Sequence, residues 1–381
     1  MTISGLLFPL LVLLAFLVSQ ISPAYIVFGL LTLLWFLEMR RRARWAPSLG
    51  SPLVLVAGLQ VVLLALSTLF SRDPAVSARH LAGASLLLLL AIGIDLLEDP
   101  SKARAVFCAI GGNGVLLSIL GFWQFAHGGD GMENRIRGTL SHTMTFSGLT
   151  MIAGCLLLGF AFEERGRWRW LGLAAVLPLA AMMLTFTRNT YVGTMAALLL
   201  YVVVRWPRRL VLLVPALLVV FLLVPSEIRG RIRSIGDPTQ MTNHDRIAML
   251  HAGLRMIADY PIFGLGPEMV RPYYVLYRDQ DALFLQVPHL HNNTLQVAAQ
   301  SGLFAAAAYL AMMGLFFART ILLLRREDRP DRAALLAGAL LAGTAVFAAG
   351  FFEYNWGDTE VQMATLLVLA VPFSQSTARK R

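Results

Sequence analysis

The stretch LVLLVPALLVVFLLVP, from Leu210 to Pro225, contains no charged residue and ends where the chain turns polar. A helix needs about 20 mostly apolar residues to cross about 30 Å of hydrocarbon. Similar apolar runs recur throughout the 381 residues, of which 57% are hydrophobic and only 14% are charged. Such a composition lies outside the range of soluble globular domains. The sequence therefore predicts an all-α polytopic membrane protein.

Hydropathy along the chain predicts about twelve transmembrane helices. We place them near residues 5–20, 24–38, 52–70, 80–97, 105–126, 143–162, 170–187, 189–204, 210–225, 294–323, 333–352 and 359–374. This pattern divides the chain into three parts. Residues 1–225 hold helices 1 to 9, residues 226–293 form one long loop, and residues 294–381 hold helices 10 to 12 and a tail. No Lys or Arg precedes the first apolar run, so we expect a retained helix there and not a signal peptide.

The net charge of +10 comes from basic residues that lie between the apolar runs instead of forming one patch. In this pattern they indicate membrane topology and not nucleic-acid binding. With the N-terminus in the cytoplasm, short basic loops such as Arg40–Arg44 and Arg165–Arg169 all fall on the cytoplasmic side. We therefore expect both termini in the cytoplasm and the long loop on the opposite face.

The long loop between the ninth and tenth predicted helices contains one amphipathic segment, Asp245–Tyr260. Asn243 precedes it as a possible cap, and Pro261 ends it. Its apolar side chains recur at helical spacing, at Ile247, Leu250, Leu254 and Ile257. The spacing predicts a helix that lies on the membrane surface. Long polar loops of this kind usually carry function.

The strongest candidate for chemistry is the stretch HLHNNTLQ, from His289 to Gln296, where the loop enters the tenth predicted helix. A histidine at the water boundary has an ordinary pKa near 6.5, so its neutral form can accept a proton at physiological pH. The alternative is a structural histidine that caps the helix. His291 is the residue we favour as a general base.

Three arginines are candidates for binding an anion on the same face. Arg188 separates two apolar runs, where a charge is costly unless it is paired or binds an anion. Arg246 begins the amphipathic segment and could clamp a phosphate. Arg137, two residues after Arg135, precedes the sixth predicted helix and would widen such a site. The alternatives are a snorkelling arginine, a solvated helix face and simple loop charges.

No phosphate-binding loop, dinucleotide fingerprint, nucleophile elbow or zinc-spaced His/Cys set occurs in the sequence. We therefore expect no cofactor and no metal. Asp279 and Asp281 are spaced like paired acids that hold a divalent metal, but two such acids are common in solvated loops. Whether these two residues have a role stays open.

Several of these motifs together resemble the O-antigen ligase and polymerase family of bacterial inner-membrane proteins. His291-Asn292, followed after nine residues by Gly302, is similar to that family's histidine motif. Thr187-Arg188 resembles its arginine between helices, and Arg246 with DYPIFGLG (259–266) resembles the stretch that opens its large periplasmic loop. Arg137-Gly138-Thr139 is similar to a further signature of the family.

The resemblance implies transfer of a glycan from undecaprenyl pyrophosphate to a second sugar hydroxyl, on the periplasmic side of the inner membrane. In a ligase the acceptor is the lipid A core, and the reaction makes lipopolysaccharide. His291 would act as the base, while Arg188, Arg246 and Arg137 would bind the pyrophosphate. Asn292 and Glu353 would support them, Glu353 by orienting His291 or an arginine. The reaction would be inverting and would need no metal.

Two other functions remain open at this point. An O-antigen or exopolysaccharide polymerase would use the same donor with another lipid-linked glycan as acceptor. Gly302 is followed by Leu303-Phe304-Ala305, where ligases often have a Thr-Trp pair, so the motif does not separate the two enzymes. A transporter for the lipid-linked glycan is the alternative from another class, and the scarcity of charge in the predicted helix centres argues against it.

Overall fold

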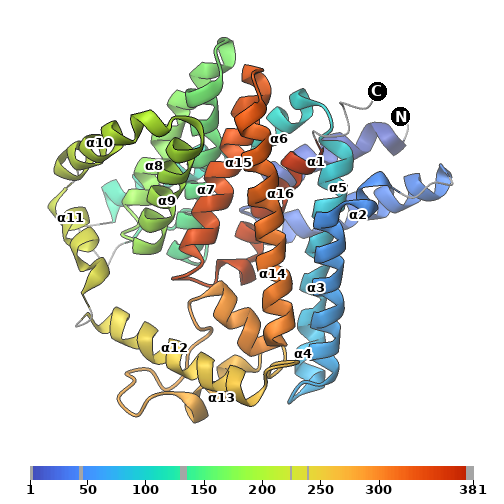
Figure 1. Ribbon diagram of the computed structural model, residues 1–381, viewed down its shortest axis with the longest axis vertical. Coiled ribbons are helices and arrows are strands. Elements are labelled where there is room, and N and C mark those ends of the chain that lie inside the picture. Colours follow the sequence, from blue (N-terminus) through green and yellow to red (C-terminus); the bar gives the residue numbers. More distant parts are fainter. Residues whose placement is uncertain (1–2, 43–45, 129–134, 224, 238–239, 375–381) are drawn as a thin grey trace.

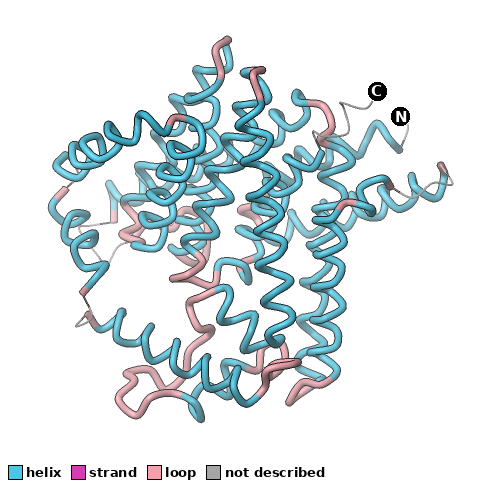
Figure 2. The backbone as a smooth tube through the Cα atoms, in the orientation of Figure 1, coloured by secondary structure: helices cyan, strands magenta, loops and turns pink. Residues whose placement is uncertain are grey.

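The computed structural model describes residues 3–42, 46–128, 135–223, 225–237 and 240–374. Within these ranges all regular structure is helical and no strand occurs, as Figure 2 shows. The α-helices are α1 (Ile3–Phe16), α2 (Ile21–Arg41), α3 (Pro52–Leu69), α4 (Pro74–His80), α5 (Leu88–Leu96), α6 (Pro100–His127), α7 (Thr143–Glu163), α8 (Val176–Met183), α9 (Arg188–Arg205), α10 (Leu210–Leu223), α11 (Ser226–Arg233), α12 (Met241–Asp259), α13 (Val270–Tyr277), α14 (Asn293–Arg326), α15 (Pro330–Ala349) and α16 (Thr359–Ser374). The predicted all-α class is confirmed.

Among the described residues, seven helical segments are long and apolar enough to cross a membrane. They are α2, α3, Pro74–Leu96, α6, α7, α14 and α15, while α1 and α16 are shorter apolar helices. The other three predicted spans, 170–187, 189–204 and 210–225, correspond to α8, α9 and α10, which are shorter or more polar. The predicted span 80–97 is interrupted by a 3-10 segment, Leu81–Leu87. The count of twelve stays a prediction.

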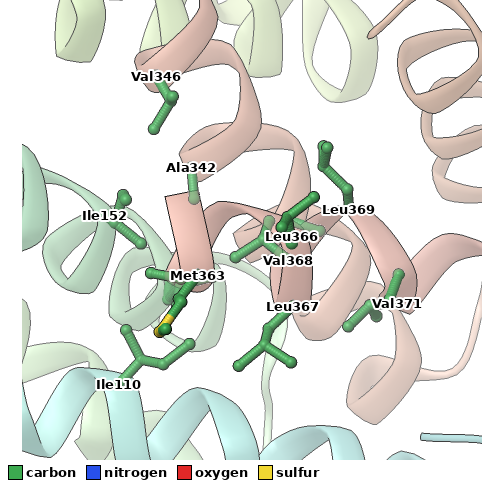
Figure 3. Packing of buried hydrophobic residues seen from close by; sticks show 14 of the residues in the cluster. Ile110, Ile152, Ala342, Val346, Met363, Leu366, Leu367, Val368, Leu369 and Val371 are labelled. Carbon is green, nitrogen blue, oxygen red and sulfur yellow. The ribbon is translucent and has the colours of Figure 1, made fainter. Parts of the chain in front are cut away.

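The centre of the bundle is formed by α7, α15 and α16, which are buried along most of their length (Figure 1). Figure 3 shows Met363 and Leu367 of α16 gathered with Ile110 of α6 and Ile152 of α7. At Gly159 of α7, an added Cβ would lie only 2.5 Å from the carbonyl oxygen of Ala334 and the amide nitrogen of Gly338 on α15. The close approach of these two helices therefore requires glycine.

Two ends of the bundle differ in character. At one end, Arg205 of α9 donates to Glu163 at the end of α7 at 2.9 Å and to the Leu324 carbonyl near the end of α14 at 3.1 Å. Consequently the first residues of α9 and α14, Arg188 and Asn293, lie at the opposite end. We call this the loop end, because α12 and α13 cross it in Figure 1.

The amphipathic helix of the long loop is present as α12, and its predicted cap is wrong. The residue before the first turn is Gln240, and Asn243 lies inside that turn. The Asn243 side chain does not cap the helix; it donates to the Asp237 carbonyl and accepts from Arg188. The predicted apolar face at Ile247, Leu250 and Leu254 is exposed. The opposite face packs into a second apolar cluster, which includes Met249, Ala252, Met256, Leu265, Tyr274, Leu290 and Leu295.

Candidate active site

His291 lies on a short irregular segment directly before α14. Asn292 caps that helix: its side-chain oxygen accepts from the Leu295 amide at 2.9 Å, and its amide nitrogen donates to the Phe351 carbonyl at 3.1 Å. The backbone of His291 has φ of +49°, a left-handed conformation that non-glycine residues rarely adopt. Such strained residues cluster at functional sites, where the surrounding structure holds them in place.

Asn293 fastens this segment to the loop between α15 and α16. Its backbone amide donates to the Gly350 carbonyl at 2.7 Å, and its side-chain nitrogen donates to Asn355 Oδ1 at 2.7 Å. Its side-chain oxygen accepts from the Trp356 amide at 3.0 Å. One buried asparagine therefore sets the position of Glu353, which lies between Gly350 and Asn355, relative to His291.

Glu353 faces two histidines. Its Oε2 lies 3.0 Å from His291 Nδ1, and its Oε1 lies 3.5 Å from His289 Nε2. The two imidazole rings meet edge to face at 4.3 Å between centroids. A carboxylate can only accept a hydrogen bond, so the proton of neutral His291 lies on Nδ1 and its Nε2 is left as an acceptor. In His289 the Nδ1 accepts from the His291 amide at 3.3 Å, which places its proton on Nε2.

The electrostatics of this cluster keep Glu353 ionised and His289 neutral. Burial raises the pKa of Glu353, but the hydrogen bond from His291 and the electrostatic interactions with His291 and His289 outweigh it, so the pKa of Glu353 is lowered. Burial lowers the pKa of His289 to about 4, and the Glu353 carboxylate offsets only part of this effect. A carboxylate that orients a histidine through Nδ1 is a common arrangement for general bases.

These three side chains also have the composition of a metal site. Their ligand atoms, from His289, His291 and Glu353, lie within 4.8 Å of one another. Two imidazoles and one carboxylate form a known ligand set for zinc. The same cluster could therefore act in proton transfer or hold a metal, and the two uses exclude each other at Glu353 and His291.

A cavity of about 250 Å³ lies next to this cluster, and two of the three predicted arginines, Arg188 and Arg246, line it. Arg188 is only 6% exposed, and its guanidinium is hydrogen-bonded within the protein. It donates to the Ser234 carbonyl at 2.7 Å, to Thr242 Oγ1 at 2.7 Å and to Asn243 Oδ1 at 2.6 Å. Arg246, half-buried on α12, donates a hydrogen bond to no residue that the structure describes. The two arginines therefore differ in how much of their hydrogen-bonding capacity is available.

The remaining charge in this cavity is mostly positive. Burial lowers the pKa of Arg246, an effect that Glu353 opposes and Arg231 strengthens. Arg231, which sequence reasoning missed, lies beside this group and donates to the Phe186 carbonyl at 3.4 Å. In addition, the side-chain oxygen of Asn189 is buried in the cavity wall and has no hydrogen-bond partner among the described residues.

The arginines before α7 are placed differently from the expectation. Arg135 reaches the cavity region, where it donates to the Thr185 carbonyl and to Thr187 Oγ1, each at 2.7 Å. Arg137, the residue we favoured, is exposed. Its backbone amide donates to Gln124 Oε1 at 3.1 Å and its carbonyl accepts from the Leu140 amide at 3.0 Å, while its guanidinium donates to no residue that the structure describes. The resemblance of Arg137-Gly138-Thr139 to a family signature favoured Arg137 in the sequence, and no local signal indicated the contacts of Arg135 with Thr185 and Thr187.

Asp279 and Asp281 lie away from the histidine cluster and pair with basic residues on α12. Asp279 accepts from His251 at 2.7 Å and from Arg255 at 2.6 Å, while Asp281 lies 3.3 Å from His244. The hydrogen bonds from His251 and Arg255 outweigh burial and lower the pKa of Asp279. These contacts fasten the segment after α13 to α12.

Fold and site together define a membrane protein with a histidine-carboxylate cluster and a cationic cavity at one end of an all-helical bundle. A protein-family model described as O-antigen ligase matches residues 173–310, which include Arg188, Arg246 and His291. This match confirms the family resemblance expected from the motifs, and it supports a glycan ligase or polymerase type of function. Arg137 and Glu353 lie outside the matched range. No match was found among curated proteins.

Proposed function

We propose that this protein transfers a glycan from undecaprenyl pyrophosphate to the lipid A core oligosaccharide, as an O-antigen ligase of the bacterial inner membrane with its site on the periplasmic side. The observation that carries the proposal is Arg246, a half-buried guanidinium with no hydrogen-bond acceptor among the described residues, near a histidine held by Glu353. A buried cation with free donors favours an anionic ligand. The pyrophosphate of the donor is such an anion.

His291 is the base in this proposal. Its Nδ1–H is held by Glu353 at 3.0 Å, so Nε2 is available to take the proton of the acceptor hydroxyl. The carboxylate also stabilises the imidazolium that forms. His289 stays neutral because its pKa is lowered to about 4, and it adds no charge that would oppose protonation of His291.

The arginines have different roles in binding the donor. Arg246 contacts the pyrophosphate directly, while Arg188 contributes its charge and fixes Ser234, Thr242 and Asn243 around the cavity. Fixed positive charge in a partly buried cavity stabilises the negative charge that develops as the pyrophosphate leaves. Arg137, exposed at the edge of this region, contributes at longer range.

The transfer forms one glycosidic bond and breaks one bond between the donor sugar and phosphate. The acceptor oxygen forms a bond to the anomeric carbon of the donor sugar while its proton passes to His291 Nε2. The bond between that carbon and the phosphate oxygen breaks, and undecaprenyl pyrophosphate leaves with the electron pair. Attack on the face opposite the leaving group inverts the anomeric centre. No nucleotide or metal is required.

The test is transfer by the purified full-length protein, with undecaprenyl-pyrophosphate glycan, lipid A core and EDTA. We expect product from the wild type, a 10²- to 10⁴-fold slower rate for His291→Ala, and a roughly 10- to 100-fold slower rate for Glu353→Gln. His251→Ala is the matched control, because His251 also pairs with a carboxylate, at 2.7 Å from Asp279, but lies outside the cluster.

Each other outcome selects a different function. Longer chains from donor alone, with no product on lipid A core, would favour the polymerase. Donor binding without any glycosidic product would favour a transporter. Activity that EDTA abolishes and zinc restores would assign the histidine cluster to a metal instead of proton transfer.

A further inference from the structure

A second cavity lies on the other side of the histidine cluster. Its volume is about 390 Å³, within the range of about 300–1,000 Å³ typical of small-molecule sites. Three consecutive residues run from the first cavity to the second. Phe352 lines the first cavity, Glu353 contacts both histidines, and Tyr354 lines the second cavity. The segment that carries Glu353 thus connects the two cavities, and the histidine pair that Glu353 contacts lies at this connection.

The lining of the second cavity differs chemically from that of the first. It contains amide and hydroxyl side chains, among them Gln60, Gln300 and Gln362, together with the aromatic rings of Tyr354 and Trp356. Its charged side chains include both signs, because Arg79 and Glu268 both line it. Amides and hydroxyls suit the many donors and acceptors of sugar hydroxyls, and aromatic rings offer flat apolar faces to sugar rings.

One buried polar atom in this cavity has no partner within the described part of the chain. The Gln60 side chain on α3 is 8% exposed, and its Oε1 accepts no hydrogen bond. An unpaired amide oxygen costs free energy unless a ligand or solvent satisfies it. In a cavity wall, such an atom indicates a site built to receive a hydrogen-bond donor.

The cavity is connected to the base by packing and by hydrogen bonds. The ring of Tyr354 lies 5.7 Å from that of His289. From the other direction, the Leu290 amide donates to Gln296 Oε1 at 2.9 Å, and Gln296 donates to Gln300 Oε1 at 3.3 Å. The phenol of Tyr354 offers the cavity one hydrogen-bond donor and one acceptor.

The cavity also has room for more than one sugar. A neighbouring cavity of about 500 Å³ shares His80 and Glu268 with it and continues along α4 and α13, past Arg72 and Arg271. Glu268 has φ of +64°, so a second strained non-glycine residue lies at the junction of the two volumes. A single monosaccharide would leave this extension unused, whereas an oligosaccharide would occupy it.

We infer that the cavity lined by Gln60, Gln362 and Tyr354 binds the acceptor oligosaccharide and presents its hydroxyl to His291, opposite the cationic cavity that takes the donor. The inference rests on the proposed function for its direction, since that function requires two glycans at one base. The recognised chemistry is that of sugar hydroxyls. The glycan could come from a lipid A core or from a second lipid-linked chain, and the experiment separates these sources.

The experiment titrates the detergent-solubilised full chain with two lipid-free probes, a core oligosaccharide and a single repeat-unit oligosaccharide, by calorimetry. We expect one probe to bind, and Gln60→Leu and Gln362→Leu each to weaken that binding by about 3- to 10-fold through loss of a hydrogen bond. The core probe would identify a ligase acceptor, and the repeat-unit probe a polymerase acceptor. In the transfer assay, the KM for acceptor should rise while the KM for donor stays unchanged.

Thermal unfolding provides the control, because substitution of a residue with only a structural role would lower the unfolding midpoint. Because Gln60 Oε1 is buried without a partner, Gln60→Leu should not lower the midpoint of thermal unfolding. Thr365→Val is the matched variant, since Thr365 lies on α16, donates only to the Val361 carbonyl at 2.7 Å and lines neither cavity. It should leave acceptor binding unchanged.

Two results would overturn the inference. In the first, neither probe binds to the wild type. In the second, a probe binds to the wild type and to the two glutamine variants with the same affinity. Absence of transfer by the wild type is a separate result and counts against the proposed function alone. In that case glycan binding that depends on Gln60 would still establish the cavity as an oligosaccharide site.

Discussion

The centre of the bundle and its loop end are held together by different means. Where α7 meets α15, small residues let two backbones touch, and a Cβ at Gly159 would lie 2.5 Å from the Gly338 amide. At the loop end the contacts are hydrogen bonds between irregular segments, with Asn293 joining Gly350, Asn355 and Trp356. Apolar close packing without buried polar groups gives stability. Positioned polar groups, by contrast, give chemistry and are costly to hold.

The difference teaches that stability and activity should separate on substitution. A change inside the bundle should remove folded protein, and a change in the histidine cluster should remove turnover from a protein that still folds. Asn293 is the exception at the loop end, because it begins α14 and also fixes the loop that carries Glu353, so its substitution should affect both folding and turnover.

The largest effect is expected from Gly159→Ala. The added methyl group meets the backbone of α15, which cannot rotate away as a side chain would, so we expect destabilisation of about 3 kcal/mol or more. Thermal unfolding in detergent and the yield of folded protein measure it. The specific activity of the molecules that do fold should stay near the wild-type value.

Gly29→Ala on α2 is the matched control for this substitution. Nothing lies within 4 Å of a Cβ at Gly29, and an alanine inside a helix is more stable than a glycine by roughly 0.5–1 kcal/mol. We therefore expect a small rise in the unfolding midpoint. Equal destabilisation by both variants would show that close packing of α7 on α15 is not the source of stability.

Much of the bundle could be predicted from the sequence because apolar runs alone reveal helices of membrane length. The points where these helices are interrupted were harder to predict. In Leu81–Leu87 and Arg167–Ala175 the chain stays apolar enough to suggest a span, but it forms 3-10 turns that only tertiary packing determines. The amphipathic helix was placed correctly along the chain, yet Asn243 was misassigned as its cap because its bonds to Arg188 and Asp237 join segments that local sequence does not connect.

For the site, the sequence predicted residue types better than it predicted contacts. His291, Arg188 and Arg246 were found from motifs, and the structure places Arg188 and Arg246 in one cavity. His289 stood in the same motif, and its position two residues before His291 was the available signal. The separation of the lining into a cationic and a neutral cavity depends on Gln60 and Tyr354, which are nearly 300 residues apart and share no motif.

The pH dependence of stability is a sharper test of the contrast, because the contact of α7 with α15 at Gly159 is made by uncharged backbone, whereas the loop end holds His289, His291 and Glu353. The pKa of His289 is about 4 in the folded protein and near 6.5 when unfolded. As the pH falls from 6.5 to 4, the unfolded chain takes up a proton that the folded chain does not. Stability should therefore fall over this window, by about 3 kcal/mol at most, and not further below pH 4 on account of this residue.

His289→Gln isolates this contribution, since a glutamine amide can keep the hydrogen bond from the His291 amide and the contact with Glu353 but does not titrate. We expect its unfolding midpoint to fall less than that of the wild type between pH 7 and pH 4. The lowered pKa of Glu353 destabilises both proteins in the same direction at acid pH, mainly through His291, so the difference between the two curves reports on His289 and its interaction with Glu353. Parallel curves would mean that His289 is as accessible to protons when folded as when unfolded.

The smallest effect is expected at the edge of the loop end, from Arg137→Ala. The residue is exposed and held through its backbone, by the 3.1 Å hydrogen bond to Gln124, so removal of its guanidinium should leave the fold intact. A screened, exposed charge contributes little to binding, and we expect the KM for the lipid-linked donor to rise by less than about 3-fold at physiological salt. Arg135→Ala, by comparison, frees the Thr185 carbonyl and Thr187 beside Arg188 and should have the larger effect, on stability as well as on KM. A rise of tenfold or more for Arg137→Ala would instead make Arg137 a direct ligand of the pyrophosphate, and the donor site would then extend from the cavity at Arg246 to the segment that precedes α7.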